Sequence, residues 1–330
     1  MKVKAKDIAK AAGVSATAVS LVMNGKDSRI SEATREKILR IAREMAFQGE
    51  STVQSGGSQR TRTLGLVLPD LRDPVFGQWM AEIPEYAFRK GYTVFGCTCG
   101  DDVRRCCTVL EALAVKNVDG LVITVPSTLE KEGPLTRTLH SLQDNGVPFV
   151  LLDRAVYSIF SDFVTSDNKY GGRIAAESLL RSGARRIGCV LGPQQVYTTK
   201  KRFQGFQEGM ALCKASYREE DVFHGSFTAE AGRDAFAALT AQGCDGLFVE
   251  NGPMTQGVLA AAAEQGVQIG RELKLAAYDY QGPEAVISIR QNLTLMAEKA
   301  VDRLIERVEE PEKTMPPGNF YITPTVEDLA

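Results

Sequence analysis

Short apolar runs recur along most of the chain and are separated by longer stretches with helical spacing. Seven of these runs fall between residues 63 and 279: TLGLVLP, YTVFGC, VDGLVITV, PFVLLD, RIGCVLG, DGLFVE and LKLAAYD. Because each run is continuous rather than alternating, we expect strands buried on both faces, as in a parallel sheet covered by helices. Seven or more such strands predict an α/β fold with two doubly wound lobes.

The first 48 residues have a different pattern, in which apolar residues follow helical spacing. A first helix, within DIAKAAG, ends at Gly13, a residue suited to the position after a helix. Ser15 caps a second helix and Ser31 caps a third. Three short helices with a tight turn between the first two predict a helix-turn-helix. The side chains expected to face its core are Ile8, Ala9, Ala12, Ala18, Val19, Val22, Met23, Ile38, Ile41, Ala42 and Met45.

A polar segment joins these two parts of the chain. Residues 48–62, QGESTVQSGGSQRTR, are rich in Gly, Ser and Gln and have no apolar periodicity. Such a composition predicts a linker. We therefore divide the chain into a helical head (1–48), a linker or hinge (49–62) and a core (63–330).

Charge is distributed unevenly along the chain. The 330 residues include 39 Lys and Arg against 41 Asp and Glu, for a net charge of −2. Residues 1–62 alone carry 12 Lys and Arg against 6 Asp and Glu, so the acidic excess lies in the core. A basic head indicates a polyanionic partner, although a solvated helical face can have the same charge.

The second helix of a helix-turn-helix lies in the major groove, where small polar side chains fit against base edges. A small helical bundle for protein contact is the alternative, but a bundle has no need of small outward residues at positions 16, 17 and 20. We expect double-stranded DNA as the partner, bound by a homodimer, because one recognition helix covers only a half-site. The candidate DNA-binding residues are Ser15, Ala16, Thr17, Ser20, Leu21, Asn24 and Arg29.

The segment KDIAKAAGVSATAVSLVMNGKDSRISEATREKILRIAREMAF resembles the DNA-binding head of the lactose-repressor and galactose-repressor family of bacterial transcription factors. The resemblance implies that Ala16, Thr17 and Leu21 occupy positions that touch bases. Many members carry Arg at the last of these positions. Leu21 therefore implies an apolar contact with a thymine methyl in place of a bidentate contact with guanine.

The linker departs from the pattern of this family. Its members have a hinge helix that folds on operator binding and inserts a leucine into the minor groove. The position of that leucine falls on Gly56 here, Gly57 follows it, and Val53 is the only apolar candidate left at the hinge. We expect poor helix formation there, no bending of the operator in the family's usual way, and no switching by hinge melting.

The core is similar to the effector-binding core of the same family, which in turn resembles periplasmic sugar-binding proteins. The resemblance implies three crossings between two lobes, with lobe one at 63–156 plus 292–318 and lobe two at 157–291 plus 319–330. A small molecule would lie in the cleft between them. The resemblance also implies ligand-facing roles for Val75 and Phe76 in PDLRDPVFG, and an effector-gripping role for Arg202 in TKKRFQGF.

Polar residues stand at the ends of three predicted strands, where ligands of open α/β sheets bind. Carboxylate and amide groups suit sugar hydroxyls, although polar residues at strand ends can also merely cap loops. Gly252 and Tyr280 replace residues that are often Asp in the family, which implies a less acidic pocket. We expect a sugar or sugar derivative as the effector. The candidate effector-binding residues are Val75, Phe76, Asp153, Arg202, Asn251 and Asp279.

Other chemistry has little support in the sequence. No G-x-G-x-x-G or P-loop motif follows a predicted strand, and the two histidines lie near no serine or cysteine pattern, so we expect neither an enzyme nor a cofactor. Cys97, Cys99, Cys106 and Cys107 lie within eleven residues, but adjacent cysteines on a helix point in different directions, and we predict no metal site.

The sequence predicts a cytoplasmic protein without a membrane partner, because no apolar run is long enough to span a bilayer and the N-terminus lacks the apolar core of a signal peptide. The predicted function is a DNA-binding transcriptional regulator, and more specifically a repressor, whose operator affinity responds to a small molecule between the lobes. The alternative is a cytosolic solute-binding protein or an architectural DNA-binding protein without ligand switching, which the degenerate hinge supports.

Overall fold

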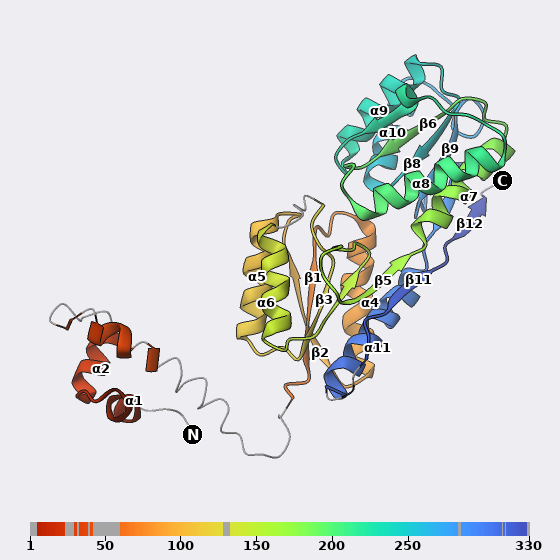
Figure 1. Ribbon diagram of the computed structural model, residues 1–330. Helices are drawn as coiled ribbons and strands as arrows, with labels where there is room; N and C mark the ends of the chain where they lie inside the picture. The colour runs from red at the N-terminus through yellow and green to blue at the C-terminus, as the bar shows by residue number, and fades with distance from the viewer. Residues whose placement is uncertain are drawn as a thin grey trace. The chain divides into compact units, whose positions relative to one another are not determined.

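The computed structural model describes residues 5–23, 30–31, 33–38, 40–41, 60–127, 133–282, 285–311, 313 and 315–328. The chain forms two compact units, Met1–Arg60 and Thr61–Ala330. Figure 1 labels their helices and strands. The first unit contains the helices of the head, and the second contains both sheets of the core.

The head packs its helices around a small apolar core. Helix α1 (Ala5–Ala12) ends at Gly13, whose φ of 68° is unfavourable for residues with a side chain. Helix α2 (Ala16–Met23) is capped by Ser15, whose Oγ accepts a hydrogen bond from the Ala18 amide at 3.1 Å. Residues 33–38 and 40–41 are also helical. The buried core consists of Ile8, Ala9, Ala12, Val19, Val22 and Ile38. The predicted core side chains of Met23, Ala42 and Met45 lie outside the described residues.

The first lobe of the core is a parallel sheet with the strand order β11-β5-β4-β3-β1-β2. Helices α4 and α11 bury their apolar residues against one face, and α5 and α6 bury theirs against the other (Figure 1). The elements are β1 (Thr63–Leu68), α4 (Pro74–Arg89), β2 (Thr93–Thr98), α5 (Val103–Val115), β3 (Gly120–Ile123), α6 (Pro134–Asp144), β4 (Phe149–Leu152), β5 (Asp162–Ser166), α11 (Leu293–Glu309) and β11 (Asn319–Ile322).

The second lobe repeats this architecture with the strand order β12-β10-β9-β8-β6-β7, in which only the β10–β12 pair is antiparallel. Helices α9 and α10 cover one face, and α7 and α8 cover the other. The elements are α7 (Asn168–Arg181), β6 (Ile187–Leu191), α8 (Tyr197–Leu212), η1 (Glu219–Asp221), β7 (Val222–His224), α9 (Ala229–Ala241), β8 (Gly246–Val249), α10 (Gly252–Glu264), β9 (Lys274–Tyr278), β10 (Ile287–Arg290) and β12 (Thr325–Asp328).

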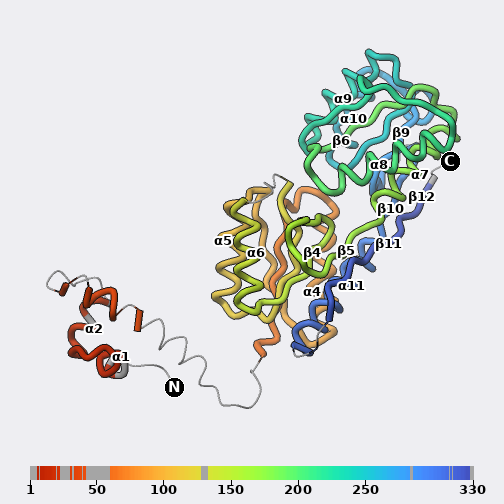
Figure 2. The backbone as a smooth tube through the Cα atoms, in the orientation of Figure 1, coloured from red at the N-terminus to blue at the C-terminus, as the bar shows by residue number. Residues whose placement is uncertain are grey.

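The chain crosses between the two sheets three times: after β5, after β10 and after β11 (Figure 2). The expected lobe boundaries differ from this pairing, because they place β5 and β11 in lobe two. In the structure β5 pairs with β4, and β11 pairs with β5, at the edge of the first sheet. The chain therefore leaves this sheet near residues 167 and 323, later than the expected crossings after residues 156 and 318.

Each of the seven predicted apolar runs contains a strand of the observed sheets, and the doubly wound α/β fold is confirmed. The strands at β5, β7, β10, β11 and β12 were not predicted. Trp79 is completely buried in the first lobe, where its indole N–H donates to the carbonyl of Leu293 at 3.1 Å.

Candidate functional site

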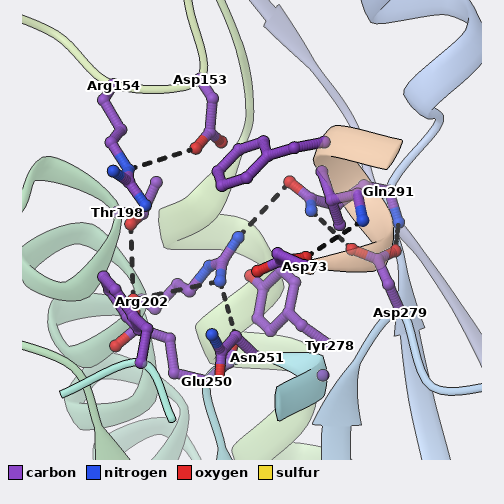
Figure 3. Close-up of a pocket in the computed structure, with 14 residues that line it drawn as sticks. Asp73, Asp153, Arg154, Thr198, Arg202, Glu250, Asn251, Tyr278, Asp279 and Gln291 are labelled. Carbon is purple, nitrogen blue, oxygen red and sulfur yellow. Dashed lines mark hydrogen bonds and ion pairs between the residues drawn. The ribbon is translucent and has the colours of Figure 1, made fainter. Parts of the chain in front are cut away.

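One cavity of the core is lined by residues of both lobes, at the carboxyl ends of the sheet strands (Figure 3). All six predicted effector-binding residues line it: Val75, Phe76, Asp153, Arg202, Asn251 and Asp279. Eight further residues line it with them: Asp73, Arg154, Thr198, Phe227, Glu250, Gly252, Tyr278 and Gln291. The structure thus brings together side chains that are up to 218 positions apart in the sequence, from Asp73 to Gln291.

Arg202 lies at the base of this cleft with its guanidinium stacked on the ring of Tyr278, 3.6 Å from the ring centroid. Its Nε donates to Asn168 Oδ1 at 2.7 Å, and its Nη1 donates to the carbonyl of Glu250 at 2.6 Å. Its Nη2 donates over 3.4 Å to Gln291 Oε1, the longest of the three contacts. The protein therefore orients Arg202, and the longest of its hydrogen bonds, to Gln291, lies on the side of the cleft.

The position of Arg202 depends on the close approach of α7 and α8. A Cβ on Gly172 would lie 1.9 Å from the Arg202 carbonyl oxygen, and one on Gly205 would lie 1.8 Å from the Lys169 carbonyl oxygen. Only glycine allows these two helices to pack at this distance. Gly205, three residues after Arg202, therefore lets α8 lie close enough to α7 to place the Arg202 guanidinium.

Glu250 is completely buried at the end of β8, and its carboxylate accepts hydrogen bonds from other groups of the protein. One oxygen accepts from the Gly192 amide at 2.7 Å, and the other accepts from the Thr199 hydroxyl at 2.8 Å. These bonds fix the first turn of α8, from which Thr198 faces the cleft. Glu250 thus positions its neighbours, because its hydrogen-bonding capacity is largely satisfied.

Asp153 and Asp279 end strands of different lobes and both have left-handed backbone, with φ of 68° and 52°. Asp279 accepts from the amide of Gln291 at 2.8 Å and from its Nε2 at 2.6 Å. Burial raises the pKa of each carboxyl above the usual value for aspartate, and the positive charges of nearby arginines act in the opposite direction. Aspartate tolerates this backbone better than most residues, and left-handed backbone recurs at ligand-binding sites.

Asp73, which sequence reasoning missed, is the N-cap of α4 and accepts from the Val75 amide at 3.0 Å. Burial raises its pKa to about 6, against an opposing contribution from that hydrogen bond and from Arg154. Asp153 and Asp279 add to the shift because their negative charges lie nearby. The carboxyl of Asp73 therefore titrates close to neutral pH.

Arg154 carries the second guanidinium of the cleft, and it is nearly buried. Its Nη1 donates to Asp101 Oδ1 at 3.3 Å and to the Val125 carbonyl at 3.0 Å. Its guanidinium lies 5.4 Å from the ring centroids of both Phe76, from the first lobe, and Phe227, from the second. Its Nε makes no hydrogen bond among the described residues but lies 3.8 Å from Asp153 Oδ2, close enough for an ion pair.

The missed residues of the cleft fall into two groups. Arg154, Glu250 and Tyr278 each lie next to a predicted site residue at a strand end. Their place at the strand end could therefore have identified them as site residues. Thr198, Phe227 and Gln291 belong to loops or helix starts with no pattern of their own, whereas Asp73 followed by Pro74 is a helix-start signal. Tyr280, whose identity suggested a less acidic pocket, is not among the lining residues.

The charge of the cleft follows from its six ionisable side chains, four carboxyls and two guanidiniums. Three aromatic rings, of Phe76, Phe227 and Tyr278, provide flat apolar surfaces beside them. Such a combination can accept and donate hydrogen bonds to several hydroxyls while an apolar face packs on a ring.

The candidate DNA-binding residues are described in part. Thr17 and Leu21 are exposed on α2, Ala16 is half-buried and Ser15 caps the helix. The side chain of Ser20 lies outside the described residues, as do Asn24, Arg29 and the hinge residue Val53. These assignments, including those for the hinge glycines, remain predictions.

The cysteine cluster belongs to the core of the first lobe. Cys99, Cys106 and Cys107 are buried, and Cys97 packs against the same apolar cluster. Cys99 donates from its thiol to the Leu68 carbonyl over 3.6 Å. Over the described residues, no three His, Cys, Asp or Glu side chains come together as metal ligands.

Two family models match the chain. Residues 4–49 match the model for "Bacterial regulatory proteins, lacI family", and residues 176–326 match the model for "Periplasmic binding protein-like domain". The chain therefore combines a lacI-type DNA-binding head with a periplasmic-binding-protein-like core. The two matches fall on the helical head and on the core that carries the cleft, in the order that the sequence predicts.

Curated LacI-family relatives match along nearly their whole length. The HTH-type transcriptional repressor PurR of Haemophilus influenzae (strain PittEE) is 27% identical over 312 residues, which is 92% of this chain and 90% of the relative. PurR of Aliivibrio fischeri (strain MJ11) is 27% identical over 316 residues, covering 92% and 91%. Both relatives are transcriptional regulators rather than enzymes.

Solved structures of LacI-family regulators have the same fold. The transcriptional regulator CelR in complex with cellobiose has a TM-score of 0.71 and 25% identity, covering 99% of this chain and 98% of that one. The Cra dual regulator of Pseudomonas putida in complex with fructose 1-phosphate has a TM-score of 0.73 and 25% identity, covering 82% and 100%. The protein is a DNA-binding transcriptional regulator modulated by a small-molecule effector.

In the described part of the chain, no helix is both long and apolar enough to cross a membrane.

Proposed function

We propose that this regulator is a cytoplasmic homodimeric repressor whose effector is a neutral polyhydroxylated molecule, such as a small sugar, bound in the cleft. The observation that carries the proposal is the meeting of carboxylates, guanidiniums and aromatic rings from both lobes around one cavity. Carboxylates and guanidiniums recognise adjacent hydroxyls by paired hydrogen bonds, and an aromatic ring covers the flat face of a sugar. The cellobiose complex of CelR supports this class of effector, whereas Cra is in complex with a phosphorylated sugar, fructose 1-phosphate.

The charge of the cleft favours a neutral effector over a phosphorylated one. Four carboxyls face two guanidiniums, and most of the donor capacity of Arg202 is already used by the protein. A phosphate placed there would meet an excess of negative charge in a buried site, which costs binding free energy. A neutral ligand avoids that cost.

Ligand binding would change operator affinity through the relative position of the lobes. The first lobe contributes Phe76 and Asp153, and the second contributes Thr198, Arg202 and Asn251. A ligand that contacts both sets favours the conformation in which they approach one another. Because this conformation sets the spacing of two heads in a dimer, effector and operator must alter each other's affinity by the same factor.

The first experiment is a thermal-shift screen of the full-length protein against neutral sugars, sugar phosphates, nucleosides and purines. A ligand at 100 times its dissociation constant stabilises the folded protein by about 2.7 kcal/mol, which gives a measurable rise in Tm. We expect a hit among the neutral sugars. A hit confined to purines or to sugar phosphates would contradict the proposed effector class.

Variants of α8 connect such a hit to the cleft. Arg202→Lys replaces the guanidinium fork with an ammonium group and removes its planar hydrogen bonds, so we expect the shift in Tm to be lost. Lys200→Ala, on an exposed position of the same helix, is the matched control and should keep the full shift. Equal shifts in both variants would mean that the ligand binds elsewhere. The effect of the hit on operator affinity, measured with operators selected from genomic DNA, then tests repression.

A further inference from the structure

A second cavity lies beside the effector cleft in the core, with a volume of about 240 Å³. By the same measure, a volume of roughly 10–15 Å³ holds one water molecule, so this cavity has room for a small organic ligand. Its walls come from residues 155–161 between β4 and β5, from Tyr197 at the start of α8, and from residues around β11. β4, β5, α8 and β11 are labelled in Figure 2.

Aromatic side chains dominate this second cavity. Tyr197 packs edge-to-face on Phe163, with ring centroids 5.2 Å apart, and lies 6.0 Å from the ring of Tyr157. Tyr157 and Phe160 also line it, although their side chains are 71% and 77% exposed. Large aromatic residues that remain exposed around a cavity indicate a surface kept for binding rather than for folding.

The polarity of this cavity differs from that of the effector cleft. Among the residues that the structure describes, no Asp, Glu, Lys or Arg side chain lines it, whereas six such side chains line the cleft. Its polar groups are hydroxyls and one amide, and the Ser161 hydroxyl is buried without a hydrogen-bond partner among the described residues. An unpaired buried hydroxyl is costly, and a ligand can supply the missing partner.

We propose that this cavity is a second ligand site, which takes a small neutral aromatic molecule carrying one hydrogen-bonding group. The aromatic walls hold a flat ring by offset or edge-to-face contacts, and the hydroxyl of Ser161 pairs with the polar group of the ligand. A sugar fits this site less well, because its many hydroxyls would lose their water partners against apolar walls.

The two cavities share the same short segments of the chain. Asp153 and Arg154 line the effector cleft, and the next two residues, Ala155 and Val156, line the second cavity. At the start of α8, Tyr197 lines the second cavity and the following residue lines the cleft. A ligand in the second site therefore alters effector affinity, a consequence that rests on the function proposed for the cleft.

Binding to the second site can be measured without effector or DNA. The probe is 4-fluorophenol, titrated against the full-length protein and followed by fluorine NMR. We expect saturable binding that Ala155→Phe abolishes, because the larger side chain fills the cavity. Ala211→Phe, at an exposed position of α8, adds the same ring away from the cavity and should leave binding unchanged.

A second variant avoids any effect on folding. Tyr157→Ala removes an aromatic wall that is 71% exposed, and should weaken probe binding by roughly three- to tenfold. No saturable binding to the wild-type protein, or equal affinity in the wild type and both cavity variants, would overturn the proposed site. Because this measurement needs no effector, a negative result leaves the proposed function of the cleft standing. A failure of that proposed function would likewise leave the second ligand site standing.

Coupling between the sites is tested with a ligand found for the cleft. Saturating 4-fluorophenol should change the Kd of that ligand, and the change should vanish in Ala155→Phe. An unchanged Kd in the presence of bound probe would overturn the coupling.

Discussion

Arg202 shows how the protein restrains a binding residue before any ligand arrives. Its guanidinium is held by Asn168, by the backbone of Glu250 and by the ring of Tyr278. The contact with Gln291 is the longest at 3.4 Å, so a ligand hydroxyl can replace it at least cost. Such restraint lowers the entropy that effector binding must overcome.

The close contact between α7 and α8 provides a test of this restraint. Gly205→Ala places a methyl group against the Lys169 carbonyl, and we expect it to destabilise the core by about 1–3 kcal/mol in urea unfolding and to weaken effector binding. Gly77→Ala is the control, since a Cβ there meets nothing closer than 3.6 Å within α4. That substitution should be neutral or slightly stabilising. Equal stability of both variants would show that the helices separate at no cost.

The raised pKa of Asp73 makes a prediction about pH. Because its pKa of about 6 lies above the value of 3.8 for an unperturbed Asp, the folded protein holds this proton over a range in which the unfolded chain has lost it. This group therefore stabilises the fold at low pH, and its contribution is lost as pH rises through about 4 to 6.

Asp73→Asn isolates this contribution, since an asparagine side chain can still cap α4. We expect the variant, relative to the wild type, to gain stability on the order of 1 kcal/mol between pH 4 and pH 7 in urea unfolding without effector. A constant difference between the two proteins over this range would contradict a raised pKa for Asp73.

At the scale of elements, sequence periodicity predicted most strands inside the sheets and the edge strand β2, but missed the interior strands β5 and β10. Runs such as TLGLVLP are apolar because β1 lies between β3 and β2 and under helices on both faces. The strands that were missed, such as NFYI at β11 and TVED at β12, are four residues long and mix polar with apolar side chains at the sheet edges. Edge strands need less apolar surface, so periodicity does not reveal them.

The candidate site was predictable to the extent that it follows strand ends or a family motif. Asp153, Asn251 and Asp279 could be selected because parallel strands end at one edge of each lobe. Phe227 and Gln291 could not, because they enter the cleft through the packing of loops that carry no periodicity. The approach of the two lobes, rather than local pattern, brings these residues to the cavity.

The second helix of the head carries a prediction on sequence recognition. Thr17 is exposed on α2, and Thr17→Ala should relax the operator preference at one or two base pairs while leaving the salt dependence of binding similar. Selection of binding sites from a random DNA library, followed by salt titrations, measures both effects. An unchanged sequence preference would remove Thr17 from the residues that contact bases.

At the scale of the whole core, Arg154 connects the lobes through its contacts with Phe76 and Phe227. Phe227→Ala removes the contact on the second lobe, and we expect it to weaken effector binding by roughly three- to tenfold. Operator affinity without effector should change less than effector affinity, because Phe227 lines the cleft and can act on the head only through the relative position of the lobes. Calorimetric titration with the effector and operator binding assays check both statements. A loss of operator affinity alone would contradict this role for Phe227.

The left-handed backbone at Asp153 and Asp279 restricts how this regulator can be redesigned as a biosensor. Most side chains disfavour a positive φ, whereas aspartate, asparagine and glycine tolerate it. A library that fully randomises both positions would therefore consist largely of strained variants. A library limited to Asp, Asn and Gly at these two positions, with wider variation at Thr198 and Val75, would sample new effectors while it keeps the fold.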